Sequence, residues 1–384
     1  MIFFPWMEEI VYGVVGFMLT RKAVKDTRAQ NNEHKSSKAI LLLAHGTPDT
    51  LGEMAEYLRL VTGGRGVPPH VVEELKHRYA QIGLRDEPTA EGPHLTRWTN
   101  RQAELLREKT GQPVYVGMRN WQPLIADTVA QMKADGITHI DAICLAPQNS
   151  RTSVGLYQRA LMDAVGDSMQ VRFIAGWATH PLLIQAFEQK MRDALNAAHA
   201  QQPDAKVAAL FTAHAVPCRT IQTSVKPVEH HGMVLATEPD TYAIECKQTA
   251  TLVAEQLRDI LPAHDAYFSF QSQGMSGGPW LGPTVEGTLA TLQQNGYTHI
   301  VMQPIGFVCD HVEILYDIDI AFEQLAKNLG ITLSRAESLN DSPKLIAALA
   351  DIALQRDRRP QPAPSTAVST AEIVTAPLPE PVDA

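Results

Sequence analysis

Leu42-Leu43-Ala44-His45-Gly46-Thr47-Pro48 and Phe211-Thr212-Ala213-His214-Ala215-Val216-Pro217 share the pattern Ala-His-x-x-Pro, and in each stretch an apolar run leads into the histidine. A second pair of stretches, residues 123–140 and 283–300, each carry a proline and then Gly-x-Thr-His-Ile, at a constant offset of 160 residues. The chain therefore contains two copies of a strand–loop–helix–strand unit, and this repeat predicts two similar lobes.

Short apolar runs alternate with amphipathic segments along the chain. The expected strands are residues 40–43, 114–116, 140–145, 171–174, 208–212, 267–270 and 300–304. The expected helices are residues 182–198, 241–261, 285–295 and 345–354. This alternation is typical of α/β proteins, in which buried parallel strands read as continuous apolar runs. We therefore expect two Rossmann-like, doubly wound lobes with parallel sheets that face one cleft.

The expected organisation has five parts. They are an N-terminal extension at 1–38, a first lobe at 39–180, a second lobe at 181–335, a helix packing back on the lobes at 336–355, and a disordered Pro/Ala-rich tail at 356–384. The apolar run at 10–19 is shorter than the roughly 20 residues of a membrane-spanning helix. Its positive charges follow it, unlike those of a signal peptide. A peripheral membrane contact and a mis-assigned start codon remain the two alternatives for this extension.

Composition narrows the class of protein. The 384 residues carry 33 Lys and Arg against 42 Asp and Glu, a net charge of −9, which argues against a nucleic-acid partner. Apolar residues make up 45% and charged residues 20%, so neither global disorder nor a polytopic membrane protein fits. The four cysteines are widely spaced, without a C-x-x-C pair, which favours a reducing compartment. We expect a cytoplasmic protein without an integral membrane span.

His45 and His214 each come directly after an expected strand. In doubly wound sheets, ligands bind beyond the carboxyl ends of the strands, so the repeat predicts that both histidines face the shared cleft. An imidazole there can accept a proton near neutral pH or bind a borderline metal such as Fe²⁺. The alternative is that Ala-His-x-x-Pro only forms a turn.

The stretch from Gly306 to Asp319 places acids and a histidine in an otherwise apolar helix start. Glu313 and Asp317 are four residues apart and so share one face of a helix, where two carboxylates form a path for a divalent cation or for protons. Asp310 is expected to cap the helix, and His311 to orient Asp310 or Glu313. The alternative is a capped helix start in contact with solvent.

Two further segments are candidates for substrate contacts. Lys76, Arg78 and Tyr79 can pair with substrate carboxylates, although a solvated helix face would explain them nearly as well. Trp280 follows a Gly-rich loop, which fits a wall against a flat ligand.

These motifs together resemble the ferrochelatases. The matching segments are 44–48, 74–83, 211–217, 271–283 and 306–317, and the resemblance extends over about residues 39–355. The sequences Ala-His-Gly-Thr-Pro and Pro-Trp-Leu-Gly-Pro are most similar to those of the coproporphyrin III branch of bacterial enzymes. The resemblance implies a chelatase-like fold around a porphyrin cleft. It also implies insertion of Fe²⁺ into coproporphyrin III, giving coprohaem for haem biosynthesis.

The resemblance also implies roles for individual residues. His214 and Glu313 would deliver the metal and accept pyrrole protons, Asp317 would continue the acidic path, and the cleft would bend the macrocycle. Position 45 usually carries Tyr in this branch, and His45 there could bind the product iron. The implied substrate contacts are His45, Lys76, Arg78, Tyr79, Ser150, Trp280 and His311.

Fe²⁺ is a substrate in this scheme, and no permanently bound cofactor is expected. Relatives that hold a [2Fe–2S] cluster use cysteines near the C-terminus, whereas the last cysteine here is Cys309, so we expect no cluster. The expected partners are the porphyrin, Fe²⁺ and transient partners in the haem pathway. The alternatives are a protoporphyrin IX ferrochelatase, a cobalt or nickel tetrapyrrole chelatase, and a non-enzymatic haem or porphyrin carrier.

Overall fold

A computed structural model describes residues 37–355, except 222–227, 231–232, 236–239 and 275–278. Nearly all of the expected N-terminal extension, including its apolar run at 10–19, lies outside the described residues, as does the expected tail at 356–384. Among the residues that are described, no helix is both long enough and apolar enough to cross a membrane.

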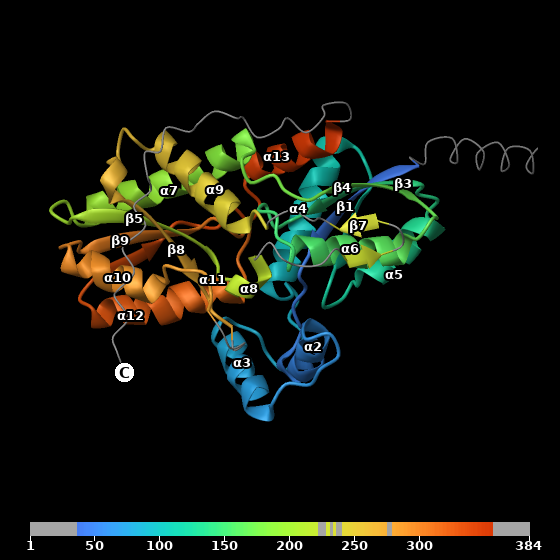
Figure 1. The fold of residues 1–384 in the computed structure, drawn as a ribbon, viewed down its shortest axis with the longest axis horizontal. Coiled ribbons are helices and arrows are strands. Elements are labelled where there is room, and N and C mark those ends of the chain that lie inside the picture. The colour runs from blue at the N-terminus through green and yellow to red at the C-terminus, as the bar shows by residue number, and fades with distance from the viewer. Residues whose placement is uncertain (1–36, 222–227, 231–232, 236–239, 275–278, 356–384) are drawn as a thin grey trace, which may run out of the picture.

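Eight parallel strands form two sheets of four (Figure 1). The first sheet has the order β2-β1-β3-β4, and its strands are β2 (Val114–Met118), β1 (Lys38–Ala44), β3 (His139–Cys144) and β4 (Gln170–Ile174). The second has the order β10-β9-β5-β8, formed by β10 (Thr332–Arg335), β9 (His299–Pro304), β5 (Val207–His214) and β8 (Ala266–Gln271). Equivalent strands of the repeat occupy equivalent places, so the predicted α/β fold with two similar lobes is confirmed.

Helices connect these strands, and two further strands form a small antiparallel pair. The α-helices are α2 (Met54–Val61), α3 (Pro69–Gln81), α4 (His94–Thr110), α5 (Ile125–Ala134), α6 (Val154–Val165), α7 (Pro181–Gln201), α8 (Cys218–Ile221), α9 (Tyr242–Gln256), α10 (Val285–Gln294), α11 (Val312–Leu315), α12 (Glu323–Asn328) and α13 (Pro343–Leu354). The remaining elements are the 3-10 turns η1 (Leu51–Glu53) and η2 (Ala263–Asp265), the π-helix η3 (Asp317–Phe322), and the paired strands β6 (Val228–His230) and β7 (Met233–Leu235).

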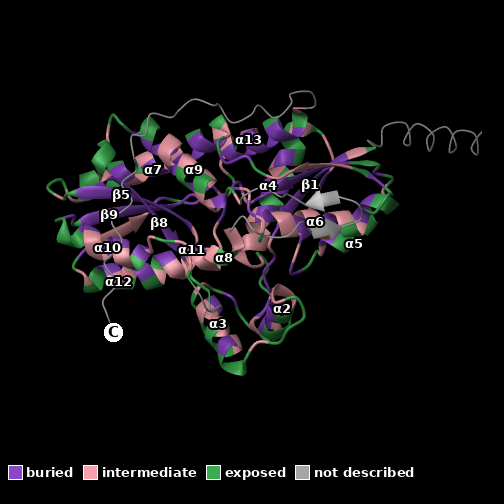
Figure 2. Ribbon diagram, viewed as in Figure 1, coloured by how far each residue is buried: buried purple, intermediate pink, exposed green. Residues whose placement is uncertain are grey.

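Alternate side chains of the central strands enter different cores. Ile40 and Leu42 of β1 join a core that runs across both lobes beneath α4, α7, α9 and α13. Leu41 and Leu43 point to the opposite face and pack on α5 and α6, while Leu210 of β5 packs on α10 and α12. The sheets are therefore buried on both faces, as the apolar runs predict (Figure 2).

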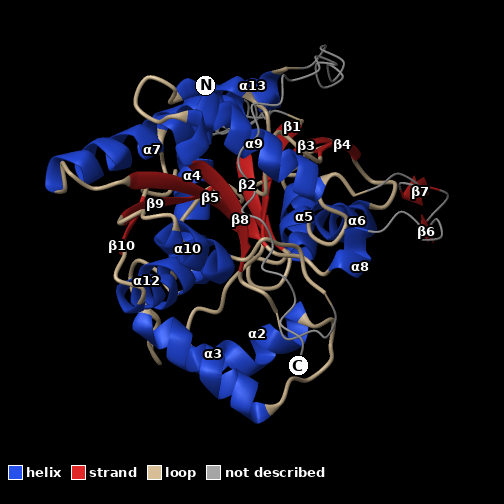
Figure 3. Ribbon diagram, turned by 60° about the vertical axis from the view of Figure 1, so that its left-hand side comes forward, coloured by secondary structure: helices blue, strands red, loops and turns tan. Residues whose placement is uncertain are grey.

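The helices that follow the last strands of the two sheets cross between the lobes. α7 follows β4 of the first sheet but packs against β5 and β9 of the second. α13 follows β10 of the second sheet and packs on α4 and α7. His180 at the start of α7 contacts Asp351 of α13, with 3.0 Å between Nε2 and Oδ2. This crossing ties the two lobes into one body, with α2 and α3 projecting at one end (Figure 3).

Candidate active site

A cavity of about 430 Å³ opens between the lobes at the carboxyl ends of the strands. Seven of the candidate residues named above line it: His45, Tyr79, Ser150, His214, Trp280, His311 and Glu313. This position agrees with the rule that ligands of doubly wound sheets bind beyond the strand ends. The fold thus brings residues that are up to 268 positions apart in the sequence to one site.

His214 and Glu313 form the charged pair of this cavity. His214 is the last residue of β5 and Glu313 lies in α11, with 3.3 Å between His214 Nδ1 and Glu313 Oε2. Burial opposes a charge on the imidazole, but the Glu313 carboxylate outweighs burial and raises the pKa of His214. Burial likewise opposes a charge on Glu313, yet His214 and then His311 hold its pKa well below the usual value. Each group therefore favours the charged form of the other.

The backbone around this pair is held by polar side chains. Tyr242 donates its hydroxyl to the carbonyl of His214 at 2.9 Å. Gln271, at the end of β8, donates its side-chain amide to the carbonyl of Glu313 at 2.8 Å. Both donors are fixed by packing, because Tyr242 is 8% and Gln271 1% exposed. The two charged side chains therefore start from rigid backbone positions.

His311 orients Glu313. Its Nδ1 is 3.0 Å from the carbonyl of Cys309. A carbonyl oxygen can only accept, so Nδ1 carries a hydrogen, and the other ring nitrogen, Nε2, faces Glu313. His311 Nε2 lies 3.6 Å from Glu313 Oε2, and the ring packs on Phe307. Of the two orienting roles open to His311 from the sequence, the geometry favours the one toward Glu313.

The expectation that Asp310 caps the helix is wrong. The residue that precedes the first turn of α11 is His311, and no side chain caps that turn. The Asp310 carboxylate instead accepts hydrogen bonds from Ser338 at 2.7 Å and from Asn340 at 2.9 Å. These partners lie some thirty residues along the chain, so local spacing could not reveal them.

Asp317 stands at the start of the π-helix, one turn beyond Glu313, and does not line the cavity. Ser272 donates its hydroxyl to Asp317, and Arg78 Nη1 lies 3.9 Å from the carboxylate. Burial, supported by the nearby Glu313, raises the pKa of Asp317. The pKa values of two neighbouring carboxyl groups are thus shifted in opposite directions, down for Glu313 and up for Asp317. Active sites separate acid and base roles by this arrangement.

The three candidates on α3 have different surroundings. Tyr79 lines the cavity and is 6% exposed. Arg78 pairs with Glu74 and reaches over the Tyr316 ring toward Asp317. Lys76 pairs with Glu73 on its own helix, at 2.9 Å, and does not line the cavity.

His45 faces His214 from the other lobe and is neutral. Asn120 donates its side-chain amide to His45 Nε2 at 3.0 Å, and Nδ1 is 3.1 Å from the carbonyl of Gly46. Burial, with the positive charge of Arg119 second, lowers the pKa of His45 to about 4. The two repeat-related histidines therefore differ in charge, because only His214 has a carboxylate beside it.

Trp280 lines the cavity and packs on the loop before it. A side chain at Gly274 would place its Cβ 2.9 Å from the Trp280 ring, so the close approach of this loop needs a glycine. Residues 275–278, the rest of that Gly-rich loop, lie outside the described residues.

Several lining residues escaped the sequence analysis. Arg119 lines the cavity and Asn120 contacts His45, and both directly follow β2, so the strand-end rule that found His45 could have found them. Tyr57 of α2, Tyr157 of α6 and Tyr242 of α9 also approach the site, but each lies on a helix whose facing depends on tertiary packing.

Fold and site together define an α/β enzyme with two like lobes and an ionised His–Glu pair in the cleft between them. The family model described as Ferrochelatase matches residues 37–357. The chain belongs to the ferrochelatase family, and it is a metal chelatase of haem biosynthesis that acts on a porphyrin and iron. The carrier alternative is therefore set aside.

The relatives extend over nearly the whole described chain. A protein named Ferrochelatase from Acidobacterium capsulatum is 54% identical over 333 residues, 85% of this chain and 98% of that protein. A protein named Coproporphyrin III ferrochelatase from Geobacillus kaustophilus is 31% identical over 333 residues, 84% of this chain and 96% of that protein. Among solved structures, SirB from Bacillus subtilis with Fe3+ matches with a TM-score of 0.46 and 12% identity, over 83% of this chain and 96% of that chain.

Proposed function

We propose that this ferrochelatase inserts Fe²⁺ into coproporphyrin III, with His214 and Glu313 as its reacting groups. The observation that carries the roles is the ion pair at 3.3 Å in the cavity between the lobes. Fe²⁺ is a substrate in this reaction. It replaces the pyrrole protons and stays ferrous, so the reaction needs no resident cofactor.

Glu313 is the group that receives the iron. Its depressed pKa keeps the carboxylate ionised, and a carboxylate oxygen is a suitable ligand for a divalent cation. A cation bound there would cancel the negative charge that raises the pKa of His214. His214 would then release its proton to water in the cleft and become a neutral imidazole, which would take up the two pyrrole protons one after the other and pass each to water. Arrival of the metal thus prepares the base.

Asp317 is the next carboxylate on this path. Its raised pKa makes it able to hold a proton at a pH where Glu313 is ionised. Arg78 Nη1 lies 3.9 Å from the Asp317 carboxylate, and the Arg78 side chain is more exposed than that of Asp317. The path from Glu313 through Asp317 therefore continues toward solvent. We assign Asp317 to the removal of protons or the approach of cations along this helix.

Arg119 supports coproporphyrin III as the porphyrin. Its guanidinium stacks 5.5 Å over the Tyr157 ring at the cavity wall, and its Nε has no hydrogen-bond partner among the described residues. Coproporphyrin III carries propionates where protoporphyrin IX carries vinyl groups. A carboxylate beside Arg119 would gain a charge-assisted bond, whereas a vinyl group would leave the guanidinium unpaired. The name of the Geobacillus kaustophilus relative agrees with this choice.

His45, Tyr79, Ser150 and Trp280 complete the proposed substrate contacts along the cavity wall. His45 is neutral, so its Nε2 lone pair could bind the iron of the product once the Asn120 amide moves away. Lys76 lies outside the lining, and its proposed contact is with a propionate at the mouth of the cleft.

The deciding experiment is anaerobic mixing of the purified enzyme with Fe²⁺ and either coproporphyrin III or protoporphyrin IX, followed by the Soret shift. We expect faster turnover of coproporphyrin III. A preference for protoporphyrin IX would overturn the choice of porphyrin but leave the reacting pair in place. Normal turnover by Glu313→Gln with either porphyrin would overturn the role of the pair.

A further inference from the structure

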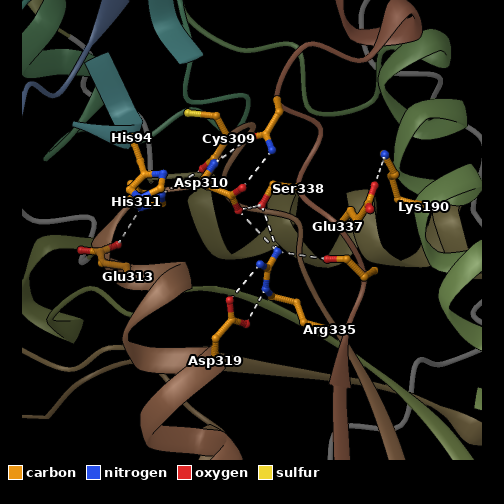
Figure 4. A network of polar contacts seen from close by, with 12 residues as sticks. His94, Lys190, Cys309, Asp310, His311, Glu313, Asp319, Arg335, Glu337 and Ser338 are labelled. Carbon is orange, nitrogen blue, oxygen red and sulfur yellow. Dashed lines mark hydrogen bonds and ion pairs between the residues drawn. The ribbon is translucent and has the colours of Figure 1, made fainter. Parts of the chain in front are cut away.

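Arg335 holds both flanks of the segment that carries Glu313 and Asp317 (Figure 4). From the end of β10, its Nε donates to Asp319 Oδ1 at 2.6 Å and its Nη2 to Asp319 Oδ2 at 2.9 Å. Its Nη1 lies 3.4 Å from Asp310 Oδ1. A two-pronged guanidinium–carboxylate pair fixes direction as well as charge. The Arg335 side chain is 16% exposed, so solvent screens it little.

Asp310 anchors the start of this segment through several polar contacts. Beside Arg335, its carboxylate accepts from Ser338 and Asn340, and its backbone N–H donates to the side-chain oxygen of Asn340 at 2.9 Å. Asn340 is held in turn, because Gln102 of α4 donates to its carbonyl at 2.7 Å. The anchor is thus connected to the first lobe, while Glu313 faces His214 of the second.

The helical segment that carries Glu313 and Asp317 is irregular. α11 has four residues and the π-helix after it has six, and α12 continues directly from the π-helix. A π-helical stretch is rare and less favourable than α-helix. Contacts from outside the segment therefore help to set the position of Glu313 relative to His214, and Arg335 makes such contacts on both sides of Glu313.

Arg335 and Asp310 do not line the cavity that holds His214. They line a separate cavity of about 440 Å³, walled also by Trp98 of α4 and Lys190 of α7. A loss of Arg335 therefore leaves the porphyrin contacts in place and changes only the carboxylate side of the site.

We propose that Arg335 is a positioning residue for metal insertion, which clamps Asp310 and Asp319 so that Glu313 and Asp317 stay aligned with His214. This inference rests on the proposed role of Glu313.

The test is steady-state kinetics of Arg335→Gln, with whichever porphyrin the wild-type enzyme uses. Misplacement of a reacting group by about 1 Å lowers the rate by up to roughly a hundredfold. We therefore expect kcat to fall by about 10- to 100-fold. The KM for the porphyrin, and its binding without iron, should remain at the wild-type values. Arg335→Lys keeps the charge but loses the fork, and it should restore part of kcat.

The matched control is Arg192→Gln. Arg192 of α7 forms the same kind of two-pronged pair with Asp259, just after α9, at 2.6 and 3.0 Å, and neither residue lines the cavity that holds Glu313. Its replacement should lower the stability without changing kcat. A stability loss in both variants, with kcat lowered only in Arg335→Gln, separates positioning from general weakening of the fold.

Asp319→Asn provides a second approach if Arg335→Gln does not fold. It should lower kcat in the same way, and the double variant should be no slower than the more impaired single variant, because both remove one clamp. Wild-type kcat in Asp319→Asn, or a rise in porphyrin KM with kcat unchanged, would overturn the clamp. If Glu313→Gln itself retains activity, the proposed role of Glu313 fails instead, so the two failures are distinguishable.

Discussion

Oε2 of Glu313 lies 3.3 Å from Nδ1 of His214 and 3.6 Å from Nε2 of His311. One carboxylate oxygen thus faces two imidazoles, one at the end of β5 and one in the loop between β9 and α11. His311 is held by a backbone carbonyl and orients the oxygen, whereas His214 is the partner whose protonation depends on it. We therefore expect a cation that binds Glu313 to lower the pKa of His214.

Replacement of His214 by Ala should lower kcat for iron insertion by roughly 10²- to 10⁴-fold, the usual effect of losing a positioned acid–base group. Coproporphyrin III should still bind, which quenching of tryptophan fluorescence can measure. The control is His139→Ala, which removes an exposed histidine at the start of β3. Turnover near the wild-type rate in His214→Ala would remove this histidine from the mechanism.

Replacement of Glu313 by Gln should lower the pKa of His214, because the carboxylate is what outweighs burial. An NMR titration of the His214 ring protons measures this directly and needs no turnover. Asp351→Asn is the matched control, because it removes a carboxylate 3.0 Å from a different histidine, His180. An unchanged His214 titration in Glu313→Gln would mean that the ion pair is absent in solution.

The ion pair should stabilise the fold most between about pH 4.5 and 6.5. The folded pKa of His214 is raised above 6.5, so its contribution is complete below 6.5 and is lost as the pH rises through the raised value. The folded pKa of Glu313 is well below 4.5, so its contribution is complete above 4.5 and is lost as the pH falls through the low value. Urea unfolding of the wild type and Glu313→Gln at several pH values gives the difference.

That difference should shrink at both pH extremes. His45, whose pKa is lowered to about 4, also makes stability depend on pH, but burial is the largest cause of that shift and Glu313 a minor one, so most of this dependence is common to both proteins. A difference that does not vary with pH would contradict the pair's contribution.

Replacement of Ser272 by Ala should raise the pKa of Asp317 further, because the serine hydroxyl donates to the ionised carboxylate. If Asp317 must ionise during turnover, the acid limb of the pH–rate profile moves to higher pH. Asp317→Asn should abolish the acid limb, which would identify Asp317 as the group that titrates there. An identical acid limb in Ser272→Ala and the wild type would place the titration elsewhere.

Replacement of Arg119 by Met should lower kcat/KM for coproporphyrin III by about 10- to 100-fold, the range for loss of a hydrogen bond to a charged group. Protoporphyrin IX should lose less, because it carries fewer propionates. Arg159→Met is the control, because Arg159 lies on α6 outside the lining of the cavity. Equal losses for both porphyrins would show that Arg119 does not select between them.

Local patterns predicted most of the fold. The apolar runs found seven of the eight parallel strands, because a strand buried on both faces shows itself as a continuous apolar stretch. They missed β10, whose four residues Thr-Leu-Ser-Arg are half-buried and include a single apolar side chain. The expected helix over 241–261 ends earlier, at Gln256. Local patterns set no bounds for α2 to α6, although the repeat implied a helix within residues 123–140, where α5 lies.

The spacing argument for Glu313 and Asp317 was right about their proximity but not about the element. They do not share a regular α-helix, since a four-residue α-helix and a π-helix meet between them. Residues on both sides of this break, Asp310 and Asp319, contact Arg335, which lies outside the segment. Helical spacing cannot predict such a break.

Local sequence was enough to predict the two lobes and the strand-end positions of His45 and His214, because burial and strand direction act on neighbouring residues. The pairing and charge of His214, against the neutral state of His45, depend on tertiary contacts, because the difference comes from Glu313, 99 residues after His214. The tertiary structure also decided that α7 and α13 cross between the lobes and that Asp310 is an anchor rather than a cap. Contacts between distant segments set these features, and no local pattern encodes them.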